Sequence, residues 1–375
     1  MKRIMFLIES LAVGGAEKVL TDMANNLDKE KYDITVISIY NKSIYRDYQI
    51  QFQNIFEDHI RYKYLCDTSD ERGFKMFNRL QNRLPSGVFH KMFIKEKYDI
   101  EIAFSEGMPA KIVSGAGNRG GTDKYAWLHT DTGNLVKSMS SREVRGLKKT
   151  YSKFDRIIAV SKSVANSFNR EINPHRDIDV KYNPVDEKKI IALSTPGVQK
   201  MEKRLMNLIA VGRLTEVKGY DRLLKAAAKL RQDGLDFRLQ IVGEGEQRWQ
   251  LEKYIEENDL ESFVQLLGFQ KNPYKYMSQA DLFVCSSRAE GFSTVVTEAL
   301  ILGLPVVTTD CAGMRELLGD NEFGIVADNN DEAIYLALKD MLEDRDKYQH
   351  YKKQALKRSS YFSMERSISE LEKIF

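Results

Sequence analysis

Short apolar runs alternate with amphipathic segments along most of the chain. In the first half, several runs have the length and the β-branched or aromatic character of buried strands: 4–8, 34–39, 100–104, 125–128 and 156–161. Apolar residues recur at helical spacing in 17–27 and 162–168, and 111–116 is a further apolar segment. A similar series follows, with strands expected at 207–211, 238–242, 264–267, 282–285, 306–308 and 324–326. Helices are expected at 220–233, 247–258, 273–280, 293–302, 331–342, 346–360 and 363–375. This alternation predicts an α/β fold with parallel, doubly wound sheets.

The periodic pattern is interrupted once, near the middle of the chain. It stops around Tyr182–Asp186, and residues 194–200 are polar and rich in turn formers. We therefore predict two Rossmann-like domains, 1–190 and 191–360, with a last helix over 361–375 that belongs with the first domain.

Composition is that of a soluble globular protein. The 375 residues are 42% hydrophobic and 30% charged, and no apolar run approaches the roughly 18 residues that a membrane-spanning helix needs. The opening residues are better explained as a strand and loop than as a signal peptide, so we expect a cytoplasmic protein. Cys66, Cys285 and Cys311 are far apart, which favours buried thiols over a disulfide framework or a metal cluster.

The net charge of +3 is unevenly distributed. Residues 1–195 contain 32 Lys and Arg against 25 Asp and Glu, a net charge of +7, which leaves −4 for the remainder. Residues 71–97 combine an apolar stripe with seven basic residues, and 137–156 is a second basic run. Two interpretations stay open: peripheral contact with an anionic membrane, or a core-packing helix pair with a solvated basic face.

The segment 281–305 joins a strand, a polar loop and a helix. Ser293 or Thr294 is placed to cap the helix, whose first turn leaves backbone N–H groups free to bind an anion. Glu290 and Glu298 bracket this phosphate-binding position. A phosphate site flanked by acids suits a ligand with both phosphate and hydroxyl groups, such as a sugar nucleotide.

Two loops in other parts of the chain also join a strand to a helix. Arg213 and Lys218 follow the strand at 207–211, where ligands bind parallel sheets, and together these cations would hold a diphosphate. The alternative is a pair of cations on a solvated loop. Gly14 and Gly15 would let the backbone approach a ligand closely, although a simple tight turn explains them equally well.

These motifs together resemble the glycosyltransferase family 4 enzymes of the GT-B fold. The resemblance rests on E-x7-E at Glu290–Glu298, G-R-L-x3-K-G at 212–219 and G-G-A-E at 14–17, in that family's order along the chain. It implies two doubly wound Rossmann-like domains facing a cleft, with the C-terminal helix crossing back to the first domain. It also implies transfer with retention of anomeric configuration.

The resemblance assigns roles in the second domain to residues of this sequence. It implies that Arg213 and Lys218 neutralise the donor diphosphate, that Glu298 binds the ribose hydroxyls and that Glu290 contacts the donor sugar. It places the phosphate at the backbone amides of Gly291, Phe292, Ser293 and Thr294.

The first domain receives two further roles. The loop with Gly14 and Gly15 would close over the donor, and His129 would lie near the donor sugar and the acceptor. Without the resemblance, a lone histidine after a strand is more often structural.

The predicted function is a retaining hexosyl- or N-acetylhexosaminyltransferase that uses a nucleotide sugar, most simply a UDP-sugar. The predicted acceptor is a lipid-linked saccharide or polysaccharide in surface or capsular polysaccharide synthesis. No cofactor and no nucleic acid partner are expected. A metal ion is not expected either, because no D-x-D sequence follows a strand and Arg213 and Lys218 supply the positive charge. The alternatives are a UDP-sugar epimerase of the GT-B fold, a phosphorylase of that fold, and a nucleotide-sugar-binding protein without catalysis.

Overall fold

The chain divides into two compact units. The computed structural model describes residues 1–11, 14–42, 55–117, 121–173, 176–195 and 205–375. The first unit comprises Met1–Pro184 and Glu365–Phe375, and the second comprises Val185–Met364. The break therefore precedes the boundary predicted after residue 190. Residues 196–200 of the predicted linker, and Ala12 and Val13 of the glycine loop, lie outside the described residues.

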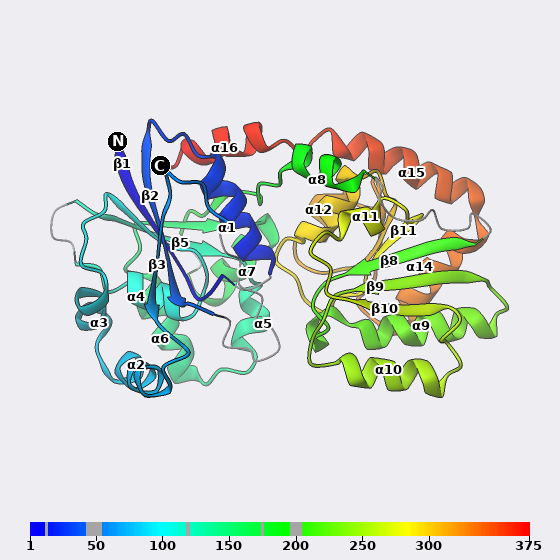
Figure 1. Ribbon diagram of the computed structural model, residues 1–375, viewed down its shortest axis with the longest axis horizontal. Helices are drawn as coiled ribbons and strands as arrows, with labels where there is room; N and C mark the ends of the chain where they lie inside the picture. The colour runs from blue at the N-terminus through cyan, green and yellow to red at the C-terminus, as the bar shows by residue number, and fades with distance from the viewer. Residues whose placement is uncertain (12–13, 43–54, 118–120, 174–175, 196–204) are drawn as a thin grey trace. The chain divides into compact units, whose positions relative to one another are not determined.

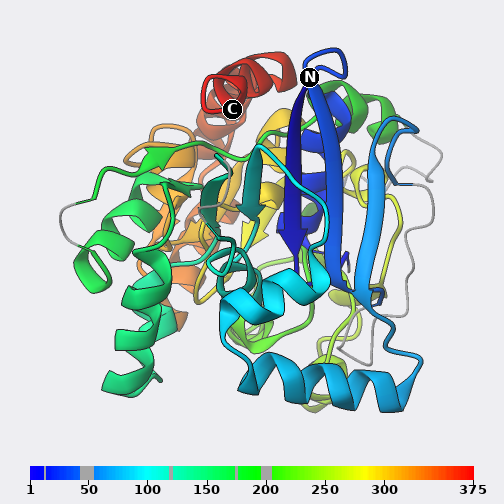
Figure 2. The ribbon, with the colours of Figure 1, turned by 90° about the vertical axis from the view of Figure 1, so that its left-hand side faces the viewer.

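The first unit is built on a parallel sheet in the order β3-β2-β1-β4-β5-β6-β7, and its strands β3, β2 and β1 lie side by side in Figure 2. Every neighbouring pair of these strands is parallel. Central strands such as β1 have almost fully buried apolar side chains, as expected for strands covered on both faces. The strands are β1 (Lys2–Ile8), β2 (Tyr32–Tyr40), β3 (Arg61–Cys66), β4 (Ile100–Ala103), β5 (Asp123–Leu128), β6 (Arg156–Ala159) and β7 (Asp179–Val180).

The helices of the first unit follow its strands in the alternating pattern (Figure 1). They are α1 (Gly15–Asn26), α2 (Glu71–Arg83), α3 (Ser86–Phe93), α4 (Met108–Val113), α5 (Thr132–Val136), α6 (Ser141–Tyr151) and α7 (Lys162–Glu171). Sequence analysis did not identify β3, because this edge strand has mostly exposed side chains and no continuous apolar run. Residues 111–113 of the apolar segment 111–116 are the end of the helix α4, and a turn follows at 114–115.

The last helix, α16 (Met364–Glu372), begins where the chain returns to the first unit. The ring of Phe375 contacts those of Phe6 and Tyr32, with centroids 6.2 and 6.0 Å apart. Leu371 is buried, and Lys31 donates a 2.8 Å hydrogen bond to Glu372. The prediction that the C-terminal helix crosses back to the first domain is therefore confirmed.

The second unit has its own parallel sheet, in the order β10-β9-β8-β11-β12-β13. Its strands are β8 (Met206–Val211), β9 (Phe237–Val242), β10 (Val264–Gly268), β11 (Leu282–Cys285), β12 (Val306–Thr309) and β13 (Ile325–Ala327). Its helices are α8 (Glu187–Ser194), η1 (Glu216–Lys218, a 3-10 turn), α9 (Tyr220–Gln232), α10 (Arg248–Glu257), α11 (Tyr274–Met277), α12 (Thr294–Ile301), α13 (Met314–Leu318), α14 (Asp331–Glu343) and α15 (Arg345–Ser359). The predicted parallel α/β architecture is confirmed in both units.

Apolar packing holds the helices of the second unit to its sheet. α9 and α14 lie against each other, and their buried leucines join the strand residues in one cluster. α12 is apolar nearly all round, which explains why it is buried in the unit rather than lying on its surface. The carboxyl end of β11 and the start of α12 are therefore fixed by the core.

Candidate functional site

The predicted cations and acids of the second unit meet at one point of its sheet. β8 and β11 are neighbours in the sheet. The strands β9 and β10 continue the sheet on the side of β8, and β12 and β13 continue it on the side of β11, so β8 and β11 form a topological switch point. Ligands of parallel sheets bind in the crevice at such points. Arg213 and Lys218 belong to the loop after β8, and Glu290 belongs to the loop after β11.

Lys218 and Glu290 form a direct ion pair. The Lys218 Nζ lies 2.6 Å from Glu290 Oε1, and Ser287 Oγ donates to the same oxygen at 2.6 Å. Burial lowers the pKa of Lys218, but the adjacent Glu290 carboxylate more than offsets this, so the pKa of Lys218 lies above its ordinary value. Lys218 therefore remains protonated and positively charged at neutral pH.

Backbone contacts bring these two loops together. Gly219 has φ +65°, and a Cβ at this position would overlap the Ser286 carbonyl oxygen. Only glycine combines this left-handed conformation with so close an approach. Ser286 Oγ donates to the Lys218 carbonyl at 3.0 Å, and the Arg288 N–H donates to the Val217 carbonyl at 2.7 Å.

A second ion pair, which sequence analysis missed, joins the same loops. Arg288 forms a bidentate pair with Asp221 at 2.7 and 2.6 Å and also donates to the Glu216 carbonyl at 2.8 Å. Its partners are distant in sequence, so no short motif reveals the pair. Arg288 therefore fixes the loop that carries Glu290 to the start of α9.

The start of α12 corrects one expectation. Ser293 occupies the N-cap position, but its side chain makes no capping hydrogen bond. Its Oγ is buried and has no hydrogen-bond partner within the described residues. A buried hydroxyl without a partner beside the first turn of a helix provides a donor for an anion. Thr294 is the first residue of α12 rather than its cap.

The neighbouring loop residues are held against the next strand-helix connection. Phe292 is buried, and a Cβ on Gly313 would lie within 3.1 Å of the Phe292 Cα and closer still to the Gly291 carbonyl oxygen. Glycine at 313 therefore lets the chain at 291–292 lie close to α13. This contact fixes the backbone that leads into α12.

Glu298 lies deeper in the unit than Glu290. It is 3% exposed, and the Tyr274 hydroxyl donates to its Oε1 at 3.1 Å. Tyr274 was not singled out from the sequence, since nothing in its local pattern marks it. The two glutamates of E-x7-E thus have different partners, Lys218 for one and Tyr274 for the other.

Arg213 differs from Lys218 in its surroundings. Its side chain is exposed, and no described carboxylate forms an ion pair with it. It is near enough to Lys218 to lower the pKa of that residue slightly. The second unit therefore has one cation already paired and one exposed cation on the same loop.

The first unit contains the remaining predicted residues. Gly14 is the N-cap of α1, and Gly15 is its first residue. The Glu17 carboxylate lies where a Cβ on Gly14 would be, so the glycine lets an acid fold back over the start of the helix. The structure therefore places a negative group at this helix N-terminus, where a close approach of the backbone to the donor was expected.

His129 follows β5 and packs on aromatic rings. Its ring centroid lies 4.8 Å from that of Phe104 and 6.5 Å from that of Trp127, nearly parallel to the latter. Its Nε2 is buried and has no hydrogen-bond partner in the described part of the chain. Burial lowers the pKa of His129 to about 3, so the imidazole is neutral at physiological pH.

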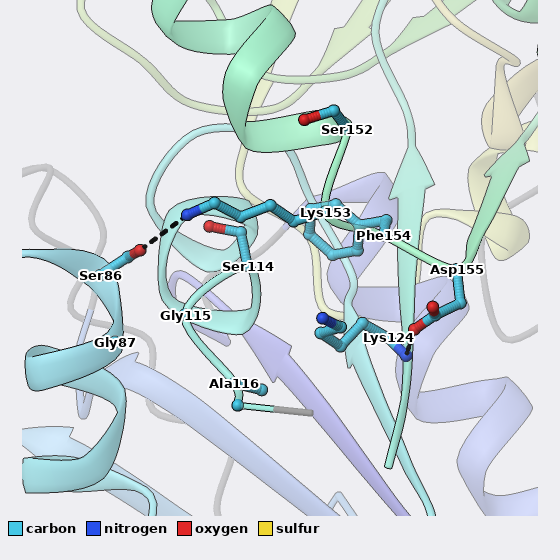
Figure 3. A pocket seen from close by; sticks show the side chains of 11 residues that line it. Ser86, Gly87, Ser114, Gly115, Ala116, Lys124, Ser152, Lys153, Phe154 and Asp155 are labelled. Carbon is cyan, nitrogen blue, oxygen red and sulfur yellow. Dashed lines mark hydrogen bonds between the residues drawn. The ribbon is translucent and has the colours of Figure 1, made fainter. Parts of the chain in front are cut away.

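A cavity of about 470 Å³ lies elsewhere in the first unit (Figure 3). It lies at the amino-terminal ends of β5 and β6, and His129 follows the carboxyl-terminal end of β5. Lys124 and Lys153 line it, and Lys153 donates to Ser86 Oγ at 3.4 Å. None of the predicted site residues lines this cavity.

The helices that the structure describes include none with both the length and the apolar character required to cross a membrane.

The fold resembles that of solved glycosyltransferases. HepE of Anabaena, in a structure with UDP and glucose, is 19% identical, and the match covers 100% of this chain and 99% of HepE with a TM-score of 0.78. The fold is that of the GT-B class.

Sequence comparison identifies the family. Residues 13–189 match the family described as Glycosyltransferase Family 4, and residues 198–358 match Glycosyl transferases group 1. The chain belongs to glycosyltransferase family 4.

Two curated relatives illustrate the range of this similarity. An N-acetylgalactosamine-N,N'-diacetylbacillosaminyl-diphospho-undecaprenol 4-alpha-N-acetylgalactosaminyltransferase of Campylobacter jejuni is 37% identical over 56% of this chain and 57% of its own length. The amylovoran biosynthesis glycosyltransferase AmsK of Erwinia amylovora is 34% identical over 36% of this chain and 35% of its own length. The chain thus spans about half the length of the first relative and about a third of the second.

Proposed function

We propose that this protein transfers a hexosyl or N-acetylhexosaminyl unit from a nucleotide sugar, a UDP-sugar in the simplest case, with retention of configuration. The acceptor in this proposal is a lipid-linked saccharide or polysaccharide of bacterial surface or capsular polysaccharide synthesis. The observation that carries the proposal is the meeting of Lys218, Glu290 and the start of α12 at the switch point of the second sheet.

The charges at this point suit a departing nucleoside diphosphate. Breaking the sugar-phosphate bond develops negative charge on the diphosphate, and cations with helix amides placed beforehand stabilise it. Lys218 is held as a cation, Arg213 is exposed beside it, and the Ser293 hydroxyl has no hydrogen-bond partner among the described residues. We infer that these residues neutralise the leaving group without a metal ion.

The acids suit the two sugar ends of one donor. Glu298 is buried and oriented by Tyr274, which favours a recognition role at the ribose over proton transfer. Oε1 of Glu290 is bound by Lys218 and Ser287, and its second carboxylate oxygen, Oε2, would accept a hydrogen bond from a hydroxyl of the donor sugar. Neither acid is assigned as a nucleophile.

In the first unit, His129 would contact the donor sugar and the acceptor. A neutral imidazole whose Nε2 has no partner among the described residues would exchange a hydrogen bond with a sugar hydroxyl and carries no charge. In a retaining transfer of this kind, the acceptor attacks the anomeric carbon from the face that the diphosphate leaves. The acceptor proton then passes to the departing phosphate oxygen.

The acceptor proposal draws on relatives and on surface charge. The Campylobacter relative is named for a diphospho-undecaprenol acceptor and AmsK for amylovoran biosynthesis. α2 and α3 pack on each other through Phe77 and Phe89, whose rings lie 5.3 Å apart, so these aromatics face the core. The same helices expose Met76, Val88 and Met92 among basic residues, which supports peripheral contact with an anionic membrane at the inner face of the cell membrane.

The test is a donor screen with a lipid-linked acceptor. UDP-glucose, UDP-galactose, UDP-N-acetylhexosamines and GDP-mannose would be supplied separately, and nucleotide release and the anomeric configuration of the product would be measured, with and without EDTA. We expect acceptor-dependent release of UDP, a retained configuration and no effect of EDTA. Interconversion of UDP-sugars without transfer would identify an epimerase, and tight binding without turnover would identify a binding protein; either result would contradict the proposal.

A further inference from the structure

Glu106 lies at the switch point of the first sheet. β1 and β4 are neighbours from which the strand order runs in opposite directions, and Glu106 belongs to the loop that follows β4. Its position in the first unit therefore corresponds to that of the Lys218 and Glu290 loops in the second. Sequence analysis did not single it out.

The Glu106 carboxylate binds the loop that carries His129. Its Oε1 accepts the backbone N–H groups of His129 and Thr130, each at 2.7 Å. Two short hydrogen bonds to one oxygen fix both the position and the orientation of this backbone. The direction in which the His129 side chain leaves the backbone depends on them.

The loop is held on its other side by Asp131. The Asp131 Oδ1 accepts the Ser167 hydroxyl at 2.7 Å and the Asn134 N–H at 3.2 Å, while Ser167 Oγ accepts the Gly133 N–H at 2.8 Å. The His129 ring itself packs on Phe104. The imidazole is thus aligned by its backbone and by ring packing, with no hydrogen bond at Nε2 among the described residues.

We propose that Glu106 is a positioning residue, which sets the imidazole of His129 for transfer by holding the backbone of His129 and Thr130. This inference rests on the proposed function, in which His129 contacts donor sugar and acceptor. Glu106 acts only as a hydrogen-bond acceptor.

The acceptor role makes a specific prediction about charge. Burial raises the pKa of Glu106, although its backbone hydrogen bonds partly oppose this. An oxygen that accepts N–H groups is present in the carboxylate, in the carboxylic acid and in an amide. Glu106→Gln therefore keeps the two hydrogen bonds, whereas Glu106→Ala leaves two N–H groups without their acceptor.

The experiment compares these two variants with a control of similar structural cost. Glu101 lies on β4, is 3% exposed and bonds the His90 ring at 2.7 Å, away from the His129 loop. Glu101→Ala would destabilise the same sheet without touching that loop. Donor and acceptor kinetics would be measured for all three variants at a temperature where each is folded.

We expect Glu106→Ala to lower kcat roughly 100-fold with little change in the donor KM, since a misplacement of about 1 Å costs this much. Glu106→Gln should retain kcat within about threefold of the wild type by the acceptor argument. Glu101→Ala should retain kcat. Equal losses in Glu106→Gln and Glu106→Ala, or an equal loss in Glu101→Ala, would overturn the proposal.

A second readout needs no turnover. The chain has five histidines, so the ¹³Cε1–H signals of labelled protein can be assigned by using His129→Gln. In the wild type and in Glu106→Gln, the His129 signal should not titrate between pH 5 and 8, and in Glu106→Ala it should move and begin to titrate. An unchanged His129 signal in Glu106→Ala would overturn the proposal, even if no donor proved to be a substrate.

Discussion

At the scale of single residues, Lys218 is both ion-paired and positively charged. Its ammonium pairs with Glu290 in the structure, and its raised pKa keeps it charged. A diphosphate arriving beside it would meet a cation already held in place. In the proposed function, the Lys218 side chain would contribute more to stabilising the charge that develops during transfer than to binding the intact donor.

Lys218→Ala should lower kcat about 100-fold or more and change the donor KM little, because it removes a preplaced cation. Steady-state kinetics of nucleotide release would measure this. Lys225→Ala is the control, because Lys225 pairs with Asp331 on the exposed side of α9. A weaker donor affinity with undiminished turnover would contradict the leaving-group role.

In the proposed function, Glu298 and Tyr274 would act at the other end of the donor. Glu298→Gln should weaken UDP binding, and Tyr274→Phe should weaken it about fivefold, through loss of the hydrogen bond that orients the carboxylate. Titration calorimetry with UDP measures both. Tyr335→Phe, in α14, provides the control. An unchanged UDP affinity in both site variants would remove Glu298 from the ribose site.

The buried imidazole of His129 makes stability depend on pH. Its pKa falls from the ordinary 6.5 to about 3, so the unfolded chain takes up a proton at a pH where the folded chain does not. The free energy of unfolding contributed by this group is fully present above pH 6.5 and is lost as the pH falls toward 3, at no more than about 1.4 kcal/mol per pH unit.

His129→Gln should therefore flatten the fall in stability between pH 6.5 and 4, as measured by urea unfolding at each pH. His350, which is exposed, provides the control variant His350→Gln. An identical pH dependence in wild type and His129→Gln would show that the imidazole is not buried in solution.

At the scale of elements, the structure joins two loops that no local motif connects. The bidentate Arg288–Asp221 pair links the loop after β11 to the start of α9, and each side chain is about one-third exposed. Such a pair adds at most about 1 kcal/mol to stability. Its main effect is to hold Glu290 opposite Lys218.

Arg288→Lys keeps the charge but loses the bidentate geometry. We expect UDP affinity to fall by roughly 10-fold, since the loop is no longer fixed, while the free energy of unfolding falls by less than about 1 kcal/mol. Arg315→Lys is the matched control, because Arg315 forms a similar pair with Asp310. If both substitutions reduced UDP affinity equally, the Arg288 pair would have no special role.

At the scale of the whole molecule, the two halves of the chain differ in net charge. The net charge of +7 lies in residues 1–195, and the exposed basic residues of α2, α3 and α6 carry much of it. Lys75, Arg79 and Lys91 are exposed on the two helices that also expose Met76 and Met92. This combination of basic and apolar groups suits the surface of an anionic bilayer.

The full chain should therefore bind vesicles that contain phosphatidylglycerol and not vesicles of phosphatidylcholine alone, with binding that weakens in high salt. Reversing Lys75, Arg79 and Lys91 to Glu should weaken binding by about 10-fold or more, at roughly 1 kcal/mol per basic residue near the surface. Reversing Lys253 and Lys357, exposed in the second unit, should have little effect. Equal loss in both sets would indicate nonspecific charge attraction only.

Much of the fold and part of the site could be predicted from the sequence. Apolar runs, helix signals and glycine loops are local features, so they located the central strands, α12 and the loops with Lys218 and Glu290. β3 was missed because its edge position leaves its side chains exposed. Ser293 is the N-cap residue of α12, as predicted, but its hydroxyl lies buried without a capping hydrogen bond to the helix.

The sequence by itself determined the alternation of strands and helices and the chemistry available at each strand end. Only the tertiary structure decided which strand ends meet. Lys218 pairs with Glu290, Tyr274 with Glu298, and Glu106 with the His129 backbone because particular strands and helices are neighbours. Strand order depends on how whole elements pack over the core, and a pattern that extends over a few residues carries no information about it.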